Sequence, residues 1–148
     1  MTAHADINRA NAATLEQLRA LVVQLTDADL ARDLGNGWTV ASMLAHMGFY
    51  DARVLSLLRR YDAGGAIEDS PIDADAINEA KLPYFQLLPA RAAAELTVAL
   101  AAECDAAVAA LSPERVAQIA AAGHPARLDR AHHRVEHLEQ IVEAVGRS

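Results

Sequence analysis

Three histidines whose spacing suits a shared metal ion are the most chemically informative residues of the chain. His133 and His137 are four residues apart in the segment RLDRAHHRVEHLEQIVEAV. On a helix, residues at this spacing rise from one face, one turn apart, with Cβ atoms roughly 6 Å from each other. Two imidazoles placed in this way can close on one divalent ion. A third imidazole, His46, is predicted to have a matching position on an earlier helix.

The stretch that carries the pair, residues 128–145, is predicted to be one amphipathic helix. At about 100° per residue, its apolar stripe consists of Leu128, Ala131, Val135, Leu138, Val142 and Val145. The opposite face is acidic and solvated. His133 and His137 lie between the two faces, at the edge of a packed helix. A site there can be held rigidly and still be reached by solvent.

His46 is predicted to lie on the flank of a helix over residues 38–61, with Thr39 as its N-cap. It shares this flank with Phe49 and Arg53. If the two helices pack with their flanks facing, the three imidazoles converge. Three nitrogen ligands that leave coordination positions open are typical of a catalytic rather than a closed structural site, and they suit zinc, nickel, iron or copper.

Asp51 falls in the middle of the apolar stripe of the same predicted helix. A buried carboxylate needs a partner, because burying an unpaired charge is costly. Two interpretations remain: a polar-core residue bonded to Trp38 or to an arginine, and a residue that supports the metal ligands. The first is favoured, because most buried polar groups are simply hydrogen-bonded.

Other groups compete for the ligand roles. His132 and Glu136 form their own i,i+4 pair, but both face the acidic side and would bind a metal only weakly. His124, in a turn, is the reserve third ligand if His46 lies far from the pair. A His-x-x-x-His pair also arises by chance on charged helices. A purely structural bundle therefore stays open, and it predicts that losing the histidines changes only local packing.

The composition predicts an all-α fold in a single domain, residues 1–148. A chain of 148 residues is long enough to bury one core without disulfides. Its hydrophobic fraction of 53% comes largely from alanine and leucine, which form helices well, and aromatic residues contribute only 4%. No segment alternates convincingly enough to predict a strand.

Charge and apolar run length argue against two classes of partner. Thirteen basic and twenty acidic residues give a net charge of −7, without a basic cluster, so we expect no nucleic-acid partner. No apolar run approaches about 20 residues, and residues 1–9 do not resemble a signal peptide, so we expect no membrane association. The lone Cys104 is expected to fill the core and fits a reducing cytoplasm, where we expect the protein.

The rest of the chain predicts further helices at about 6–25, 73–81, 89–111 and 113–121, with a short capped turn after residue 25. Gly35, Asn36 and Gly37 break the chain ahead of the second long helix. Residues 62–89 are punctuated by glycine and proline and are predicted to form a long crossover. In it, Asn78 and its aromatic neighbours Tyr84 and Phe85 either wall the site or, as favoured, only cover the end of the bundle.

The segment GWTVASMLAHM, ending near His46, and the pattern His133-x-x-x-His137-x-x-Gln140-Ile141 together resemble the DinB/YfiT-like superfamily. That superfamily includes the N-terminal domain of mycothiol-dependent maleylpyruvate isomerases. The resemblance spans nearly the whole chain. It implies a four-helix bundle in up-down-down-up order with a long crossover between helices 2 and 3, and frequent dimerisation. It also implies a zinc, nickel or iron ion, whose ligands fall on His46, His133 and His137.

Two functional classes follow. In the first, the protein is a metal-dependent enzyme, a thiol-dependent transferase or isomerase or a hydrolase, because a bound ion lowers the pKa of a thiol or water. The resemblance implies mycothiol, bacillithiol or glutathione as the thiol. Tyr50, Arg53 and Arg130 would then orient a small-molecule substrate, and no catalytic acid or base is identifiable from spacing. In the second, the protein is a non-catalytic bundle that binds a metal or small ligand, or that serves dimerisation.

Overall fold

The computed structural model describes residues 3–146, and nearly all of its regular structure is helical, which confirms the all-α prediction. The helices are α1 (Ala3–Gln24), α2 (Asp27–Leu30), α3 (Val40–Asp62), α4 (Ala74–Phe85), α5 (Ala90–Ala109), α6 (Pro113–Ala121) and α7 (Ala131–Val145), with a 3₁₀ turn η1 (Pro125–Arg127) before α7. Among these described residues, no helix is both long enough and apolar enough to cross a membrane.

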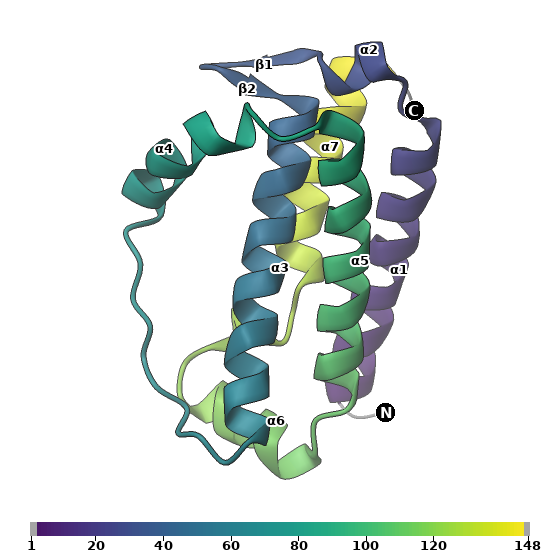
Figure 1. Cartoon of the computed structure of the whole chain (residues 1–148). Helices are drawn as coiled ribbons and strands as arrows, with labels where there is room; N and C mark the ends of the chain where they lie inside the picture. The colour runs from purple at the N-terminus through teal and green to yellow at the C-terminus, as the bar shows by residue number, and fades with distance from the viewer. Residues whose placement is uncertain (1–2, 147–148) are drawn as a thin grey trace.

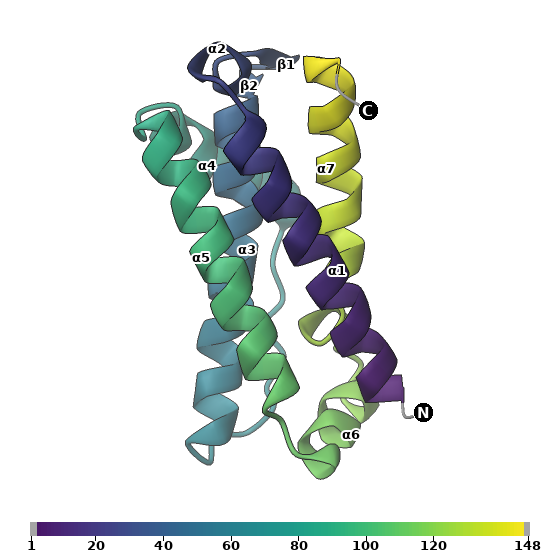
Figure 2. The same ribbon diagram turned by 90° about the vertical axis from the view of Figure 1, so that its right-hand side faces the viewer.

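Four long helices, α1, α3, α5 and α7, lie side by side (Figure 1). Helix α3 contacts α5 and α7, and α1 contacts the same two helices. Figure 2 shows α1 crossing in front of the others between α5 and α7. Helix α4 lies on the opposite side of the molecule from α1 and contacts α3 (Figure 1). The flank of α3 that faces α4 is therefore available for a site.

Side-chain caps start the helices where the sequence predicted them. The Thr39 hydroxyl accepts a hydrogen bond from the backbone N of Ser42 at 3.2 Å, and the Ser112 hydroxyl caps α6 in the same way. Such caps satisfy backbone N–H groups that have no partner inside a helix. Helix α4 begins as predicted after Asp73 but continues to Phe85, so Pro83 lies inside it.

A short antiparallel pair of strands corrects the prediction that the chain has none. Strands β1 (Asp33–Gly35) and β2 (Trp38–Thr39) pair through a tight reversal at residues 35–37. Gly35, Asn36 and Gly37 all have positive φ, at 91°, 53° and 82°, which turns the chain back on itself. Strands of three and two residues are too short to show an alternating pattern in the sequence. The hairpin places Trp38 at the start of α3.

Helix α7 begins at Ala131, three residues later than predicted, because Asn11 of α1 determines its start. The Asn11 side-chain oxygen accepts hydrogen bonds from the backbone N of Arg130 at 2.9 Å and of Ala131 at 3.0 Å. The Asn11 amide nitrogen donates to the carbonyl of Leu128 at 2.8 Å. A side chain more than a hundred residues away therefore caps this helix, which has no side-chain cap of its own.

The predicted apolar stripe of α7 is wrong at Val135 and leaves out two fully buried residues, Arg134 and Ile141. Val135 is 39% exposed, whereas its neighbour Arg134 is completely buried. Leu128 and Leu138 are buried as predicted. An arginine can occupy a core position when carboxylates pair with all of its charge, and carboxylates from α3 and α5 do so here. This exchange rotates the inward face of α7 slightly from the predicted one.

Helices α3 and α5 approach each other closely at Gly48. A Cβ atom at this position would lie only 2.8 Å from the Thr97 hydroxyl of α5, so no larger residue fits without movement. The same hydroxyl donates a hydrogen bond to the Leu44 carbonyl at 2.7 Å. This contact fixes the part of α3 that carries His46.

The crossover between α3 and α4 is held by arginines of the bundle. An Arg53 terminal nitrogen donates to the Ser70 carbonyl at 2.7 Å, and Arg127 donates to the Glu68 carbonyl at 3.1 Å. Helix α4 itself has no fully buried side chain. These bonds to backbone carbonyls therefore help to fasten the crossover, which has no core of its own, to the bundle.

Candidate metal centre

The three histidines singled out in the sequence come together in the structure. Their Nε2 atoms form a triangle, with separations of 3.1 Å between His46 and His137, 3.2 Å between His46 and His133, and 3.2 Å between His133 and His137. Among the described residues, these three form the only group of ligand-type side chains close enough to hold one ion, and no carboxylate belongs to it. His46 comes from α3 and the other two from successive turns of α7.

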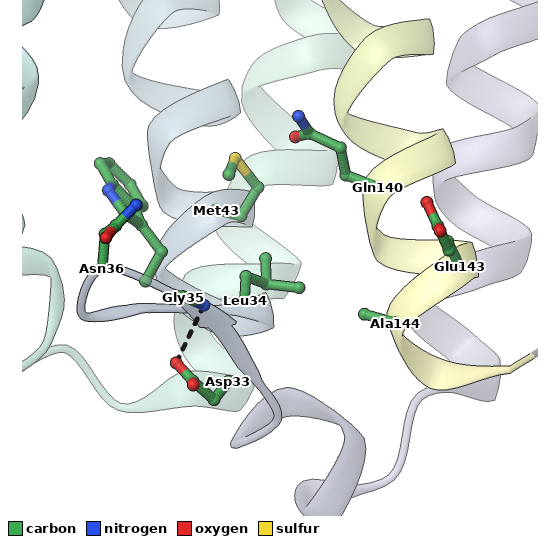
Figure 3. Close-up of a pocket in the computed structure, with 9 residues that line it drawn as sticks. Asp33, Leu34, Gly35, Asn36, Met43, Gln140, Glu143 and Ala144 are labelled. Carbon is green, nitrogen blue, oxygen red and sulfur yellow. Dashed lines mark hydrogen bonds between the residues drawn. The ribbon is translucent and has the colours of Figure 1, made fainter.

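A hydrogen bond donated to Gln140 orients the His137 ring. The Gln140 side-chain oxygen lies 2.9 Å from His137 Nδ1, so Nδ1 carries the proton and Nε2 presents its lone pair to the triangle. In Figure 3, Gln140 projects from α7 toward Met43 of α3, over a hollow of about 430 Å³ beside the β1–β2 hairpin. This contact gives one of the three rings the tautomer that a metal ligand needs.

Aromatic neighbours hold the other two rings. The His46 ring makes edge contacts with Trp38 and Tyr50, with ring centroids 5.6 and 5.0 Å apart, and the His133 ring lies 5.4 Å from Tyr50. The Nδ1 atoms of His46 and His133 are buried and have no hydrogen-bond partner among the described residues. Packing, rather than hydrogen bonding, therefore fixes these two rings.

Burial keeps His46 and His133 neutral. It lowers the pKa of each ring from 6.5 to about 3, and the positive charge that His137 would carry adds to the effect in both cases. Metal ions bind the neutral form of imidazole. The two rings therefore need to lose no proton at neutral pH before they bind an ion.

The dimensions of the triangle fit a metal ion. Ligand bonds of about 2.0 to 2.1 Å in a tetrahedral site would place nitrogen atoms roughly 3.4 Å apart, close to the observed separations of 3.1 and 3.2 Å. Each neutral ring carries only one N–H group. In a closed triangle these protons cannot satisfy the lone pairs of all three Nε2 atoms. A divalent cation at its centre would bind all three.

A buried network of charges positions the helix that carries the histidine pair. Asp51 accepts hydrogen bonds from Arg130 Nε at 2.8 Å and from Arg134 Nε at 3.1 Å. Arg134 also makes two parallel bonds to the carboxylate of Asp105 on α5, at 2.8 and 2.7 Å. The polar-core interpretation of Asp51, with arginine partners, is confirmed. Arg134 and Asp105 were not predictable from the sequence, because nothing local distinguishes a buried charged residue from a solvated one.

The competing ligands do not join the triangle. His132 and Glu136 are exposed on α7, as predicted, and neither belongs to the group of converging ligands. His124 Nε2 lies 2.9 Å from the Asp69 carboxylate in the crossover, so this histidine fastens the crossover instead of joining the triangle. No reserve ligand is needed, because His46 is in place.

A sequence model of the DinB superfamily matches residues 10–141, which include all three histidines and the residues that orient them. The chain belongs to the DinB superfamily. No significantly similar curated protein and no significantly similar solved structure is found.

A cavity of about 500 Å³ opens beside the histidines of this DinB-superfamily chain. All three histidines line it, and so do the three residues singled out for substrate contact, Tyr50, Arg53 and Arg130. This volume is in the usual range for small-molecule sites. The Tyr50 hydroxyl donates to the Asn78 side-chain oxygen at 3.2 Å, and burial raises the pKa of Tyr50, so it stays protonated.

Helix α4 forms one wall of this cavity. Asn78 lines it and also lines a second cavity, on the Trp38 side, that reaches His46 and His137. The favoured expectation, that Asn78 covers only the end of the bundle, is therefore wrong, because the crossover carries α4 across the flank of α3. Tyr84, by contrast, is 75% exposed, and Phe85 packs on Phe49 instead.

Lys81 of α4 is a charged neighbour of the site that the sequence did not indicate. Its amino group lies 3.9 Å from the centre of the Phe49 ring and 4.2 Å from that of Tyr50. The nitrogen is buried without a hydrogen-bond partner among the described residues, and burial lowers its pKa to about 8. Cation–π contacts with these rings hold α4 against α3.

Proposed function

We propose that this DinB-superfamily protein binds one divalent metal ion, zinc, nickel or iron, through His46, His133 and His137. The observation that carries the proposal is the convergence of three Nε2 atoms within 3.2 Å of one another. Depressed pKa values support it, because they keep the His46 and His133 rings neutral. The hydrogen bond that His137 Nδ1 donates to Gln140 also supports it, because it leaves the His137 Nε2 lone pair for the ion.

We further propose that the metal centre is catalytic and acts on a small molecule in a thiol-dependent transfer or isomerisation, or in a hydrolysis. A bound divalent ion would lower the pKa of a thiol or water in the open coordination positions. The chain's own residues would bind and orient the substrate: Tyr50 through its hydroxyl oxygen, whose proton is donated to Asn78, Arg53 through its guanidinium, and Arg130 through a guanidinium that Asp51 already holds in place.

The alternative is a non-catalytic module that holds a metal or a small ligand. This alternative is supported because the candidate acid–base groups near the triangle already have partners. The Tyr50 hydroxyl is bonded to Asn78, and the Asp51 carboxylate is paired with two arginines. Neither group is free to take a proton without rearrangement of its partner.

Turnover separates the two proposals. Protein reconstituted with zinc, nickel or iron would be assayed for conjugation of 1-chloro-2,4-dinitrobenzene to mycothiol, bacillithiol or glutathione, and for hydrolysis of p-nitrophenyl acetate. The enzyme proposal expects turnover that chelation abolishes, that metal restores and that His46→Ala lacks. Metal-loaded protein that turns over none of these substrates would favour the non-catalytic module.

We also propose that the four long helices form a bundle in up-down-down-up order. We propose further that two chains form a homodimer and that the protein is located in the cytoplasm. The side-by-side packing of the four long helices supports the bundle (Figure 1). Exposed Leu88 and Leu96 beside an apolar groove between α3 and α5 support the dimer, and the buried thiol of Cys104 fits a reducing compartment. Light scattering of wild-type and Leu96→Glu protein tests the dimer, which the variant should weaken.

A further inference from the structure

Three arginines line the same cavity as the histidines, in a chain that is acidic overall. Arg53 comes from α3, and Arg127 and Arg130 come from the segment that leads into α7. The chain has a net charge of −7, yet among the described residues that line this cavity the one acidic side chain is Glu136, which is exposed. Solvent screens an exposed charge strongly. The inner part of the cavity is therefore positive.

Two of these arginines are fixed by the fold. Arg130 donates to Asp51 at 2.8 Å and to the Ala126 carbonyl at 2.7 Å. Arg127 donates to the Tyr61 hydroxyl and to the Glu68 carbonyl. Both side chains are buried. Asp51 offsets the charge of Arg130, but the partners of Arg127 are neutral oxygens, so its charge is not offset.

Arg53 is less constrained than the other two. Its hydrogen bond to the Ser70 carbonyl at 2.7 Å is the one that it makes among the described residues, and its side chain is half-buried. Burial, followed by the positive charge of Arg127, lowers its pKa. Part of its guanidinium fork therefore remains for a ligand, in surroundings that lack a compensating carboxylate.

The spacing along α3 relates Arg53 to the metal centre. His46, Tyr50 and Arg53 are four and three residues apart, so they follow one face of the helix. Seven residues of helix correspond to about 10 Å along the axis. A small molecule that reaches the histidine triangle at one end can therefore reach Arg53 at the other.

We propose that the small molecule bound in this site carries an oxyanion, a carboxylate or a phosphate, that the Arg53 guanidinium binds. Arg127 and Arg130 add positive potential at the same end, and their fixed positions mean that little reorganisation is needed on binding. Arginine is well suited to this role, because its planar fork makes two parallel bonds to either group. This inference rests on the proposed function in one respect: it places the reactive end of the ligand at the three histidines.

A structural role for Arg53 is the competing explanation, since its bond to Ser70 fastens the crossover. The two explanations differ in what they predict for ligand selectivity. A fastening role predicts that replacing Arg53 weakens all ligands equally or lowers stability alone. An anion-binding role predicts that only ligands with an oxyanion lose affinity.

The test compares 3-mercaptopropionate with 2-mercaptoethanol on zinc-loaded protein by calorimetry. The two thiols share a two-carbon chain, which ends in a carboxylate in the first and in a neutral hydroxyl in the second. Wild-type protein should bind the carboxylate thiol at least about tenfold more tightly. Arg53→Gln should abolish the preference, and Arg53→Lys, which keeps the charge, should retain part of it. Arg60→Gln, on the exposed end of the same helix, is the matched control and should behave as wild type.

A metal-free arm separates this inference from the proposed function. Chelated wild-type protein would be titrated with 3-mercaptopropionate and with inorganic phosphate, while the side-chain N–H resonance of Arg53 is followed by NMR. A saturable shift supports the inference even if no metal binds, and the anion that gives the tighter curve identifies the preferred group. Equal binding of the two thiols by wild-type protein, or an unchanged preference in Arg53→Gln, would overturn it.

Discussion

Asp51 of α3 and Arg134 of α7 form a buried ion pair, with the carboxylate 3.1 Å from the arginine Nε and both side chains nearly inaccessible to solvent. Arg134 lies beside His133 in the chain, so the pair fixes the face of α7 that carries the histidines. Asp105 completes the pairing from α5. One arginine thus ties three of the four long helices together.

Replacing Asp51 by Asn should destabilise the fold by about 3 to 5 kcal/mol, the usual cost of leaving a buried charge without its partner. Urea unfolding, followed by circular dichroism, measures the change. Glu103→Gln is the control, because its pair with Arg59 is exposed and should contribute less than about 1 kcal/mol. If Asp51→Asn cost no more than the control, the network would not be holding α7.

Asn11→Ala should remove the cap of α7 together with the bond to the Leu128 carbonyl. Loss of a helix cap costs about 0.5 to 2 kcal/mol, and the buried carbonyl adds to this, so we expect about 2 kcal/mol or more in total. Gln17→Ala, at an exposed position of the same helix, should change stability by less than about 0.5 kcal/mol. Equal unfolding midpoints for the two variants would contradict the capping role.

The sequence predicted what local patterns encode. Periodicity and caps located the helices, and the spacing of His133 and His137, with the matching flank of His46, identified the three residues that converge. It could not predict contacts between distant segments. The bonds of Asn11 to residues 128–131 and of Arg134 to Asp105 join different helices. No local pattern marks Arg134 as buried, and its apolar neighbour Val135 was assigned to the core in its place.

Gln140→Ala should weaken metal binding without affecting the fold. The variant removes the acceptor that fixes the His137 tautomer, and loss of such a supporting bond typically costs 10- to 100-fold in metal affinity. Competition with a chromophoric chelator measures the affinity. Glu139→Ala is the matched control, because Glu139 is the neighbouring residue on α7 and is exposed. Equal zinc affinity in the two variants would show that Gln140 has no part in the site.

Metal-free protein should lose stability as the pH falls below about 6.5. His46 and His133 have folded pKa values of about 3 against 6.5 in the unfolded chain, so the unfolded state takes up protons first. Their contribution is therefore constant above pH 6.5 and is lost progressively between 6.5 and 3. Urea unfolding of chelated protein at pH 7.5, 6 and 5 measures the slope.

The double variant His46→Gln, His133→Gln is the comparison for this slope, because it keeps every other titrating group. It should lose less stability than wild-type protein between pH 7.5 and 5, whatever its absolute stability. If both proteins show the same pH dependence, the two rings are not held neutral by burial. Zinc-loaded wild-type protein should also resist acid better than the metal-free form, because bound metal competes with protons.

The metal content of tag-free protein, purified without added metal and measured by elemental mass spectrometry, tests the central claim most directly. The convergence of the three Nε2 atoms predicts close to one zinc, nickel or iron per chain in wild-type protein. It predicts loss of that metal in the His133→Ala, His137→Ala double variant. Absence of metal from both proteins, even after reconstitution with each ion, would contradict the metal centre.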